Sequence, residues 1–242
     1  MKPATTSKTA LVIIDVQCGF RHPTHWGTSR STPDCESNIA LLLDAARAYN
    51  KEQQLLATTA ATASSSPDAA SASSEIAICH VHHHSIYPTS LLHPSTRLEV
   101  SDGGSASMRA VDPEPFAAPQ AGEAVFVKDV NSGFIGTGLE AFLRSQGVRQ
   151  LVIVGLTTDH CVSTTTRMAS NLRVVAVRRE NDDGDVYDEG DVVLVGDACA
   201  TYAKGGFDAE TVHKVSLASL DGEFAQVEST RKVLEGVFGQ SG

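Results

Sequence analysis

Short runs of apolar and β-branched residues recur along this chain, and each is followed by a glycine or a polar residue. They lie at residues 10–16, 76–81, 124–128, 150–155 and 191–195. Because these runs are apolar without alternation, they are typical of parallel strands that helices cover on both faces. The segments between them predict helices over residues 38–54, 139–145, 161–172 and 209–220. This alternation predicts an α/β fold: a three-layer αβα, Rossmann-like architecture with a doubly wound, mainly parallel sheet of five or six strands.

The length of 242 residues suits one α/β domain, so we expect a single domain over residues 1–242 with two insertions. Residues 58–74 are almost all Ala, Ser and Thr, a composition that predicts a surface loop. Residues 179–191 are acidic, which predicts a solvent-exposed insertion outside the sheet. Residues 174–177, just before it, predict an extra strand or one arm of a hairpin.

The net charge of −10 is spread along the chain without a Lys/Arg-rich run, which argues against nucleic acid and anionic membranes as partners. A small molecule is the expected partner. The five cysteines are scattered and form no Cys-x-x-Cys pair, as expected in a reducing compartment. No stretch approaches the roughly 20 apolar residues of a membrane span, and no signal peptide is recognisable, so we expect a soluble, cytoplasmic protein.

Three of the predicted strands end on a residue that can do chemistry: Asp15, Lys128 and Cys161. Taken singly, each has an ordinary explanation as a turn former, a solvated charge or a small buried residue. Together they supply a base, a cation and a nucleophile at the carboxyl ends of parallel strands, where α/β sheets bind ligands. A helix N-terminus and a nearby lysine would lower the pKa of Cys161, and Asp15 could accept its proton.

Four segments resemble the isochorismatase-like cysteine hydrolase superfamily. They are Asp15-Val16-Gln17 with Phe20, residues 128–134, residues 155–162 (Gly-Leu-Thr-Thr-Asp-His-Cys-Val) and residues 197–201. The resemblance runs from about residue 10 to about residue 234, interrupted by the two insertions. The superfamily includes nicotinamidases and amidohydrolases that act on N-carbamoylsarcosine, biuret and ureidoacrylate, together with streptothricin hydrolases.

The resemblance implies that Asp15, Lys128 and Cys161 form a catalytic triad that hydrolyses C–N bonds through a covalent acyl-enzyme. It also implies a cis peptide between Leu156 and Thr157, and an oxyanion hole made by the N–H groups of Thr157 and Cys161. Isochorismatases that cleave a vinyl ether lack this cysteine, so its presence favours amide-type hydrolysis. The resemblance further implies a homo-oligomer, a dimer or tetramer, and no cofactor.

The run His80-Val81-His82-His83-His84 invites a metal hypothesis, because neutral imidazole is the commonest metal ligand. By resemblance, nicotinamidases carry an Asp-x-His metal pair at this strand tip, where this chain has His83 and Ser85. The pattern is broken, so we expect no metal and interpret His83 as a hydrogen-bonding contact to substrate. Histidines that point to solvent or to a subunit contact remain the alternative.

Several further residues are candidates for a substrate-binding wall, since small-molecule sites combine rings with a few polar groups. They are Phe20, Trp26, His83, Tyr87, Asn131, Phe134 and His160. Ordinary packing is the alternative for each of them. The leading hypothesis is a metal-independent hydrolase of a small carboxamide, ureide or lactam, and the alternatives are a metal-assisted nicotinamidase and a catalytically idle binding or scaffold protein.

Overall fold

The computed structural model describes residues 1–63, 74–99, 107–181 and 184–240. Its centre is a six-stranded sheet in the order β10-β9-β6-β1-β2-β5, in which every neighbouring pair is parallel. The strands are β1 (Thr9–Ile14), β2 (Ala77–His83), β5 (Ala124–Lys128), β6 (Gln150–Leu156), β9 (Asp191–Ala200) and β10 (Gln226–Glu228). The predicted doubly wound parallel sheet is therefore confirmed.

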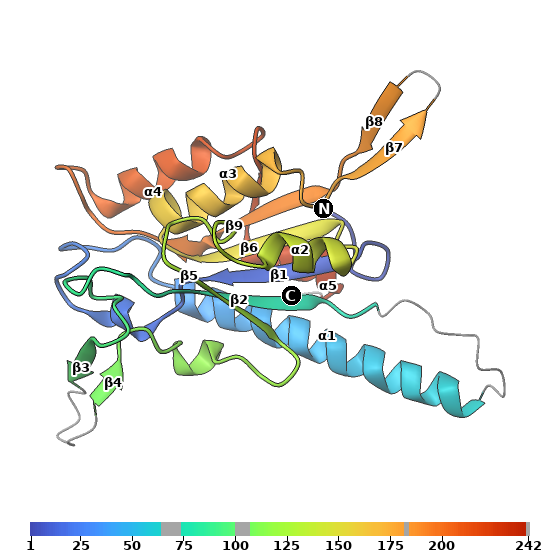
Figure 1. Cartoon of the computed structure of the whole chain (residues 1–242), viewed down its shortest axis with the longest axis horizontal. Helices are drawn as coiled ribbons and strands as arrows, with labels where there is room; N and C mark the ends of the chain where they lie inside the picture. The colour runs from blue at the N-terminus through green and yellow to red at the C-terminus, as the bar shows by residue number, and fades with distance from the viewer. Residues whose placement is uncertain (64–73, 100–106, 182–183, 241–242) are drawn as a thin grey trace.

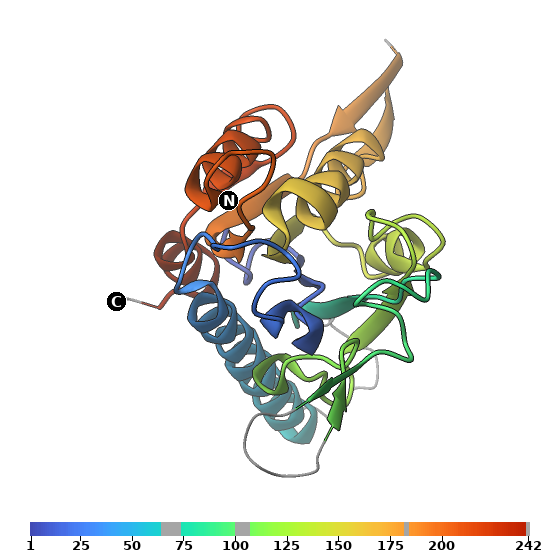
Figure 2. The ribbon, with the colours of Figure 1, turned by 90° about the vertical axis from the view of Figure 1, so that its left-hand side faces the viewer.

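Helices cover both faces of the sheet (Figures 1 and 2). The α-helices are α1 (Cys35–Ala63), α2 (Leu139–Ser145), α3 (Ser163–Asn171), α4 (Ala209–Ala218) and α5 (Thr230–Phe238). Side chains of α1 and α5 pack into one apolar core, and those of α2 and α3 pack into a second core on the opposite face. All six residues of β1 are buried between the two cores, which explains its unbroken apolar sequence.

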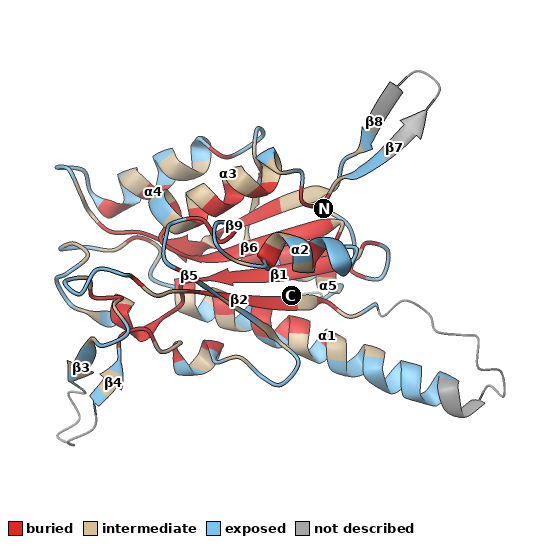
Figure 3. Cartoon of the chain, in the orientation of Figure 1, coloured by how far each residue is buried: buried red, intermediate tan, exposed pale blue. Residues whose placement is uncertain are grey.

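The edge strand β5 is half-buried or exposed at four of its five residues, whereas all residues of the central strand β1 are buried (Figure 3). Phe126 packs against Phe142 of α2 at 5.6 Å between ring centroids. Val125 and Val127 point to the opposite face and are each 48% exposed. The apolar run therefore predicted the strand correctly but not the exposure of Val125 and Val127.

Smaller elements lie outside the sheet. They are η1 (Cys18–Arg21), η2 (Pro115–Ala117), the one-turn π-helix η3 (Thr158–Val162), and two antiparallel pairs, β3 (Arg97–Glu99) with β4 (Ser107–Arg109) and β7 (Val177–Asn181) with β8 (Gly184–Asp188). The acidic insertion thus contains a β-hairpin, which projects away from the body of the molecule (Figure 1). Among the described residues, no helix is long and apolar enough to cross a membrane.

The prediction of a loop from residue 58 is wrong for its first six residues, because α1 continues to Ala63. Alanine, the strongest helix former, occupies residues 60, 61 and 63. The hydroxyls of Thr58 and Thr59 donate to the carbonyls of Gln54 and Leu55 one turn earlier. This end of α1 runs past the sheet and is exposed (Figure 3). Residues 64–73 of the predicted loop lie outside the described residues.

The strand order reverses between β1 and β6, which is where doubly wound sheets bind ligands. Gly155 of β6 makes the close approach to β1 possible. Its φ is +124°, and a Cβ at this position would lie 2.0 Å from the carbonyl oxygen of Ile14. Only glycine fits there. Because β1 and β6 are parallel, Asp15 and Cys161, which follow them in the chain, lie at the same edge of the sheet.

Candidate active site

Lys128 contacts the other two strand-end residues that the sequence singled out, Asp15 and Cys161. Its Nζ donates to Asp15 Oδ2 at 2.7 Å, to Cys161 Sγ at 3.3 Å and to His83 Nδ1 at 3.1 Å. The side chains of Lys128 and Asp15 are both 0% exposed. The structure therefore brings Asp15, Lys128 and the partly exposed Cys161 together, as the strand-end argument predicts.

Asp15 is held in an unusual backbone conformation directly after β1. Its φ is +53°, in the left-handed region that few residues other than glycine adopt, and its N–H donates to the Val81 carbonyl at 2.8 Å. Oδ2 accepts from Lys128, whereas Oδ1 is buried and has no hydrogen-bond partner. A buried acceptor without a partner costs about 1–3 kcal/mol, so an oxygen left in this state is a candidate for proton transfer.

Cys161 lies within the π-helical turn η3, two residues before α3 begins, rather than in the first turn of an α-helix. It is partly exposed, whereas the other four cysteines are buried. Burial and the Asp15 carboxylate raise the pKa of Cys161, and Lys128 only partly offsets them. The prediction of a lowered pKa is therefore wrong for the free protein, because it left out the cost of burying a thiolate next to an anion.

The peptide bond between Leu156 and Thr157 is cis, as the resemblance implies. Thr157 directly precedes η3, and its carbonyl accepts from the N–H groups of His160 and Val162 at 3.1 and 3.2 Å. Thr157 Oγ1 lies 3.4 Å from His160 Nδ1. The turn that carries Thr157 and Cys161 is thus tied together by its own backbone.

The histidine run of β2 is divided between the two faces of the sheet. His80 bonds Glu123 through Nε2 at 2.8 Å and lies 6.2 Å from the His82 ring, whereas His83 faces Lys128. In the described part of the chain, Asp15, His83 and Cys161 are the one group of three potential metal ligands that lie together. The Lys128 ammonium contacts all three, so these residues do not fit a cation.

The predicted wall residues fall into different surroundings. Phe20 and Trp26 stack at 4.6 Å between ring centroids in the loop after β1, and Tyr202 extends this aromatic group. Phe134 is 8% exposed and lies in the apolar core, which favours the packing alternative for it. His160, Asn131 and Tyr87 are exposed, and His83 bonds Lys128.

Sequence reasoning missed the ion pair beside His160. Asp159 accepts from Lys204 Nζ at 2.5 Å and from the Thr201 hydroxyl, and Lys204 Nζ lies 3.4 Å from His160 Nδ1. Burial would raise the pKa of Asp159, but Lys204 and Thr201 hold it below its ordinary value. The only sequence signal was the position of Lys204 shortly after a strand end.

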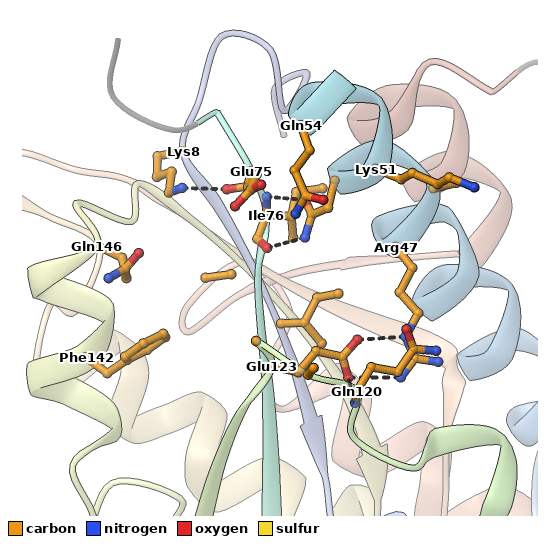
Figure 4. Close-up of a pocket in the computed structure, with 16 residues that line it drawn as sticks. Lys8, Arg47, Lys51, Gln54, Glu75, Ile76, Gln120, Glu123, Phe142 and Gln146 are labelled. Carbon is orange, nitrogen blue, oxygen red and sulfur yellow. Dashed lines mark hydrogen bonds and ion pairs between the residues drawn. The ribbon is translucent and has the colours of Figure 1, made fainter. Parts of the chain in front are cut away.

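A hollow of about 480 Å³ opens at the opposite end of the sheet, between α1 and the beginnings of β2 and β5 (Figure 4). Several of its polar groups bond one another: Arg47 binds Glu123 through two hydrogen bonds, and Asn50 bonds both backbone groups of Ile76. Asp15, Lys128 and Cys161 do not line this hollow. The candidate site is therefore at the carboxyl ends of the sheet strands.

The fold is that of an α/β protein with a doubly wound parallel sheet, and comparisons with known proteins identify its family. The model of the isochorismatase domain matches residues 9–232, so the chain belongs to the isochorismatase family of hydrolases. The uncharacterized isochorismatase family protein YrdC of Bacillus subtilis is 32% identical over 232 residues, covering 94% of this chain and 95% of the relative.

Two further relatives are informative. Ureidoacrylate amidohydrolase RutB of Variovorax paradoxus is 41% identical over 63 residues, which is 26% of this chain and 25% of that protein. A solved isochorismatase-family structure from Chromobacterium violaceum aligns with a TM-score of 0.70 and 30% identity, covering 96% of this chain and 94% of that one.

Proposed function

We propose that this chain hydrolyses a C–N bond of a small carboxamide, ureide or lactam through a covalent thioester on Cys161. The observation that carries the proposal is the cluster in which one ammonium contacts both a carboxylate and a thiol. Only a cysteine-dependent reaction uses all three groups: a nucleophile, a proton acceptor and a cation that holds them together.

The first half of the reaction forms the thioester. The Cys161 S–H gives its proton to Asp15 Oδ1 as the sulfur attacks the carbonyl carbon, and the N–H groups of Thr157 and Cys161 hold the oxyanion. The C–N bond then breaks, and Asp15 passes the proton to the departing ammonia or amine. The raised pKa of Cys161 fits this order, because the thiol keeps its proton until substrate arrives.

The second half regenerates the enzyme. Asp15 takes a proton from water, the hydroxide attacks the thioester carbonyl, and the C–S bond breaks to release the carboxylic acid and the Cys161 sulfur. Asp15 returns the proton to that sulfur. Lys128 keeps Asp15 and Cys161 in contact, and the reaction as proposed uses no cofactor.

The aromatic pair of Phe20 and Trp26 suits one wall of the substrate site, with His160 near the turn that carries Thr157. Because one relative is named ureidoacrylate amidohydrolase, ureides are the first substrates to test. In this proposal the substrate is a small molecule, with no nucleic acid or membrane as partner.

The experiment is a panel of ureides, carboxamides and lactams assayed for ammonia or amine release, or for ring opening in the case of lactams, with Cys161→Ala as the blank. We expect turnover of at least one class by the wild type, no turnover by the variant and no effect of a chelator. Release that stops on chelation would favour the metal-assisted nicotinamidase instead. If Cys161→Ala retained full activity, the cysteine mechanism would be wrong.

A further inference from the structure

The Lys128 ammonium has three N–H donors, and the structure gives it three acceptors. Two of them, Asp15 and Cys161, belong to the proposed reaction, and the third is His83 Nδ1 at 3.1 Å. An ammonium has no lone pair, so Nδ1 must be the acceptor and the ring proton must lie on Nε2. This bond therefore fixes the tautomer of His83 as well as the direction of the third donor.

The strand register explains why His83 reaches Lys128. β2 lies between β1 and β5, and His83 is paired directly with Lys128 across the β2–β5 ladder. The Lys128 side chain must cross the end of β2 to reach Asp15 after β1. The His83 ring lies on the same face as that crossing and is the nearest group of β2 that can direct it.

His83 is itself held by Gln17, a residue with 0% exposure two positions after Asp15. Gln17 Oε1 accepts from the His83 N–H at 2.8 Å, and its Nε2 donates to the His83 carbonyl at 3.1 Å and to the Val111 carbonyl at 2.8 Å. The side-chain amide of Gln17 thus bonds both the N–H and the carbonyl of His83. Contacts run without a break from Gln17 through His83 to Lys128.

We infer that His83 is a positioning residue: it holds the Lys128 ammonium between Asp15 and Cys161, and Gln17 holds His83. This role replaces the sequence-based interpretation of His83 as a substrate contact through this nitrogen. The kinetic consequences rest on the proposed function, whereas the tautomer and the contact to Lys128 do not. His80 of the same run does not share the role, since it bonds Glu123.

The electrostatics of the site agree with a neutral His83. Burial and then Lys128 lower its pKa, while Asp15, Asp129 and the Val130 backbone act in the opposite direction. A proton on Nδ1 would remove the acceptor and set two cations side by side. His83 can therefore support Lys128 only in its neutral form.

The kinetic test compares His83→Leu, which keeps bulk without an acceptor, with His83→Asn, whose Oδ1 stands at the same branch position as Nδ1. We expect His83→Leu to lower kcat about 10-fold or more, which matches the loss of a hydrogen bond to a charged group, with KM changed less than about 3-fold. His83→Asn should recover most of the lost kcat.

The matched control is His84→Gln, at the next residue, whose backbone rather than side chain contacts Lys128. It should keep the wild-type kcat and KM. Wild-type kinetics in His83→Leu, or equal losses in the Leu and Asn variants at unchanged thermal stability, would overturn the inference.

A measurement on the wild-type protein tests the tautomer of His83 without a substrate and without a variant. In ¹⁵N-labelled protein, the inference expects the His83 ring to be neutral with its proton on Nε2 at pH 7. A ring protonated on Nδ1 would overturn it, whatever the substrate panel shows. If the panel finds no hydrolysis while Nε2 carries the proton, the proposed function fails and the contact to Lys128 stands.

Discussion

Lys128 Nζ lies 2.7 Å from Asp15 Oδ2, and neither side chain is exposed to solvent. The two residues come from strands separated by β2, so this ion pair ties the edge strand β5 to the central strand β1. A buried pair of this kind adds little over an apolar pair, but breaking it leaves one charge buried without a partner. This asymmetry makes the pair testable by its effect on stability.

Lys128→Met should lower the free energy of unfolding by about 3–5 kcal/mol, because the Asp15 carboxylate loses its counterion inside the protein. Urea unfolding measures the change. The double variant Asp15→Asn/Lys128→Met should recover at least about 1 kcal/mol, since the uncompensated charge is gone. A single variant within about 0.5 kcal/mol of wild type would show that the pair is not buried as described.

Asp15→Asn should speed alkylation of Cys161 at neutral pH while abolishing hydrolysis. The Asp15 carboxylate raises the pKa of this thiol and Lys128 lowers it, so removing the anion shifts the balance toward thiolate. A pKa lower by one unit gives about 10-fold more thiolate. Iodoacetamide labelling followed by peptide mass spectrometry measures the rate, with Cys161→Ala reporting the background from the four buried cysteines. Slower labelling in Asp15→Asn would contradict the charge arrangement.

His82 should make the protein less stable as the pH falls from 6.5 to 4. Burial, helped by His80 and His84, lowers the pKa of His82 from 6.5 to about 4. In this window the unfolded chain binds a proton at His82 that the folded protein does not bind. The contribution of His82 to the free energy of unfolding is therefore highest above pH 6.5 and is lost toward pH 4. The loss from this residue is on the order of 3 kcal/mol.

Unfolding of His82→Gln across this range checks the prediction. The variant should lose less stability than the wild type between pH 6.5 and 4, while His25→Gln, which replaces an exposed histidine, should keep the wild-type slope. Parallel curves for wild type and His82→Gln would rule out this contribution.

Gly155→Ala should destabilise the protein by about 3 kcal/mol or more, because the new methyl group would meet the Ile14 carbonyl at 2.0 Å. Gly136→Ala is the matched control, since Gly136 also has a positive φ, +71°, but no atom within 4 Å of the added Cβ. It should cost only about 1–2 kcal/mol, the penalty of the backbone conformation. Equal losses in urea unfolding would contradict the account of the β1–β6 contact.

The sequence was sufficient to place the strands that matter most. Residues 124–128 form β5 with the predicted bounds, and the other four runs coincide with β1, β2, β6 and β9 within a few residues, except that β9 continues to Ala200. Their apolar composition follows directly from burial under helices. β10 was missed because it has only three residues, none of them fully buried, and the helix α5 that follows it was missed as well.

The candidate site was predictable in composition but not in its electrostatics. Strand ends placed Asp15, Lys128 and Cys161 together, since carboxyl ends of parallel strands share one edge. The raised pKa of Cys161 depends on how deeply the sulfur lies and on its distance from Asp15, and neither is encoded in local sequence. The bond from Lys128 to His83 likewise depends on the β2–β5 register.

The most direct test of the central claim is intact-protein mass spectrometry of the enzyme quenched in acid during turnover of a substrate found in the panel. We predict a mass increase equal to the acyl group of that substrate less the thiol hydrogen it replaces, located on the peptide that contains Cys161 and removed by hydroxylamine. Cys161→Ala should show neither the adduct nor product. Turnover by Cys161→Ala at the wild-type rate, with no adduct on the wild type, would contradict the proposed mechanism.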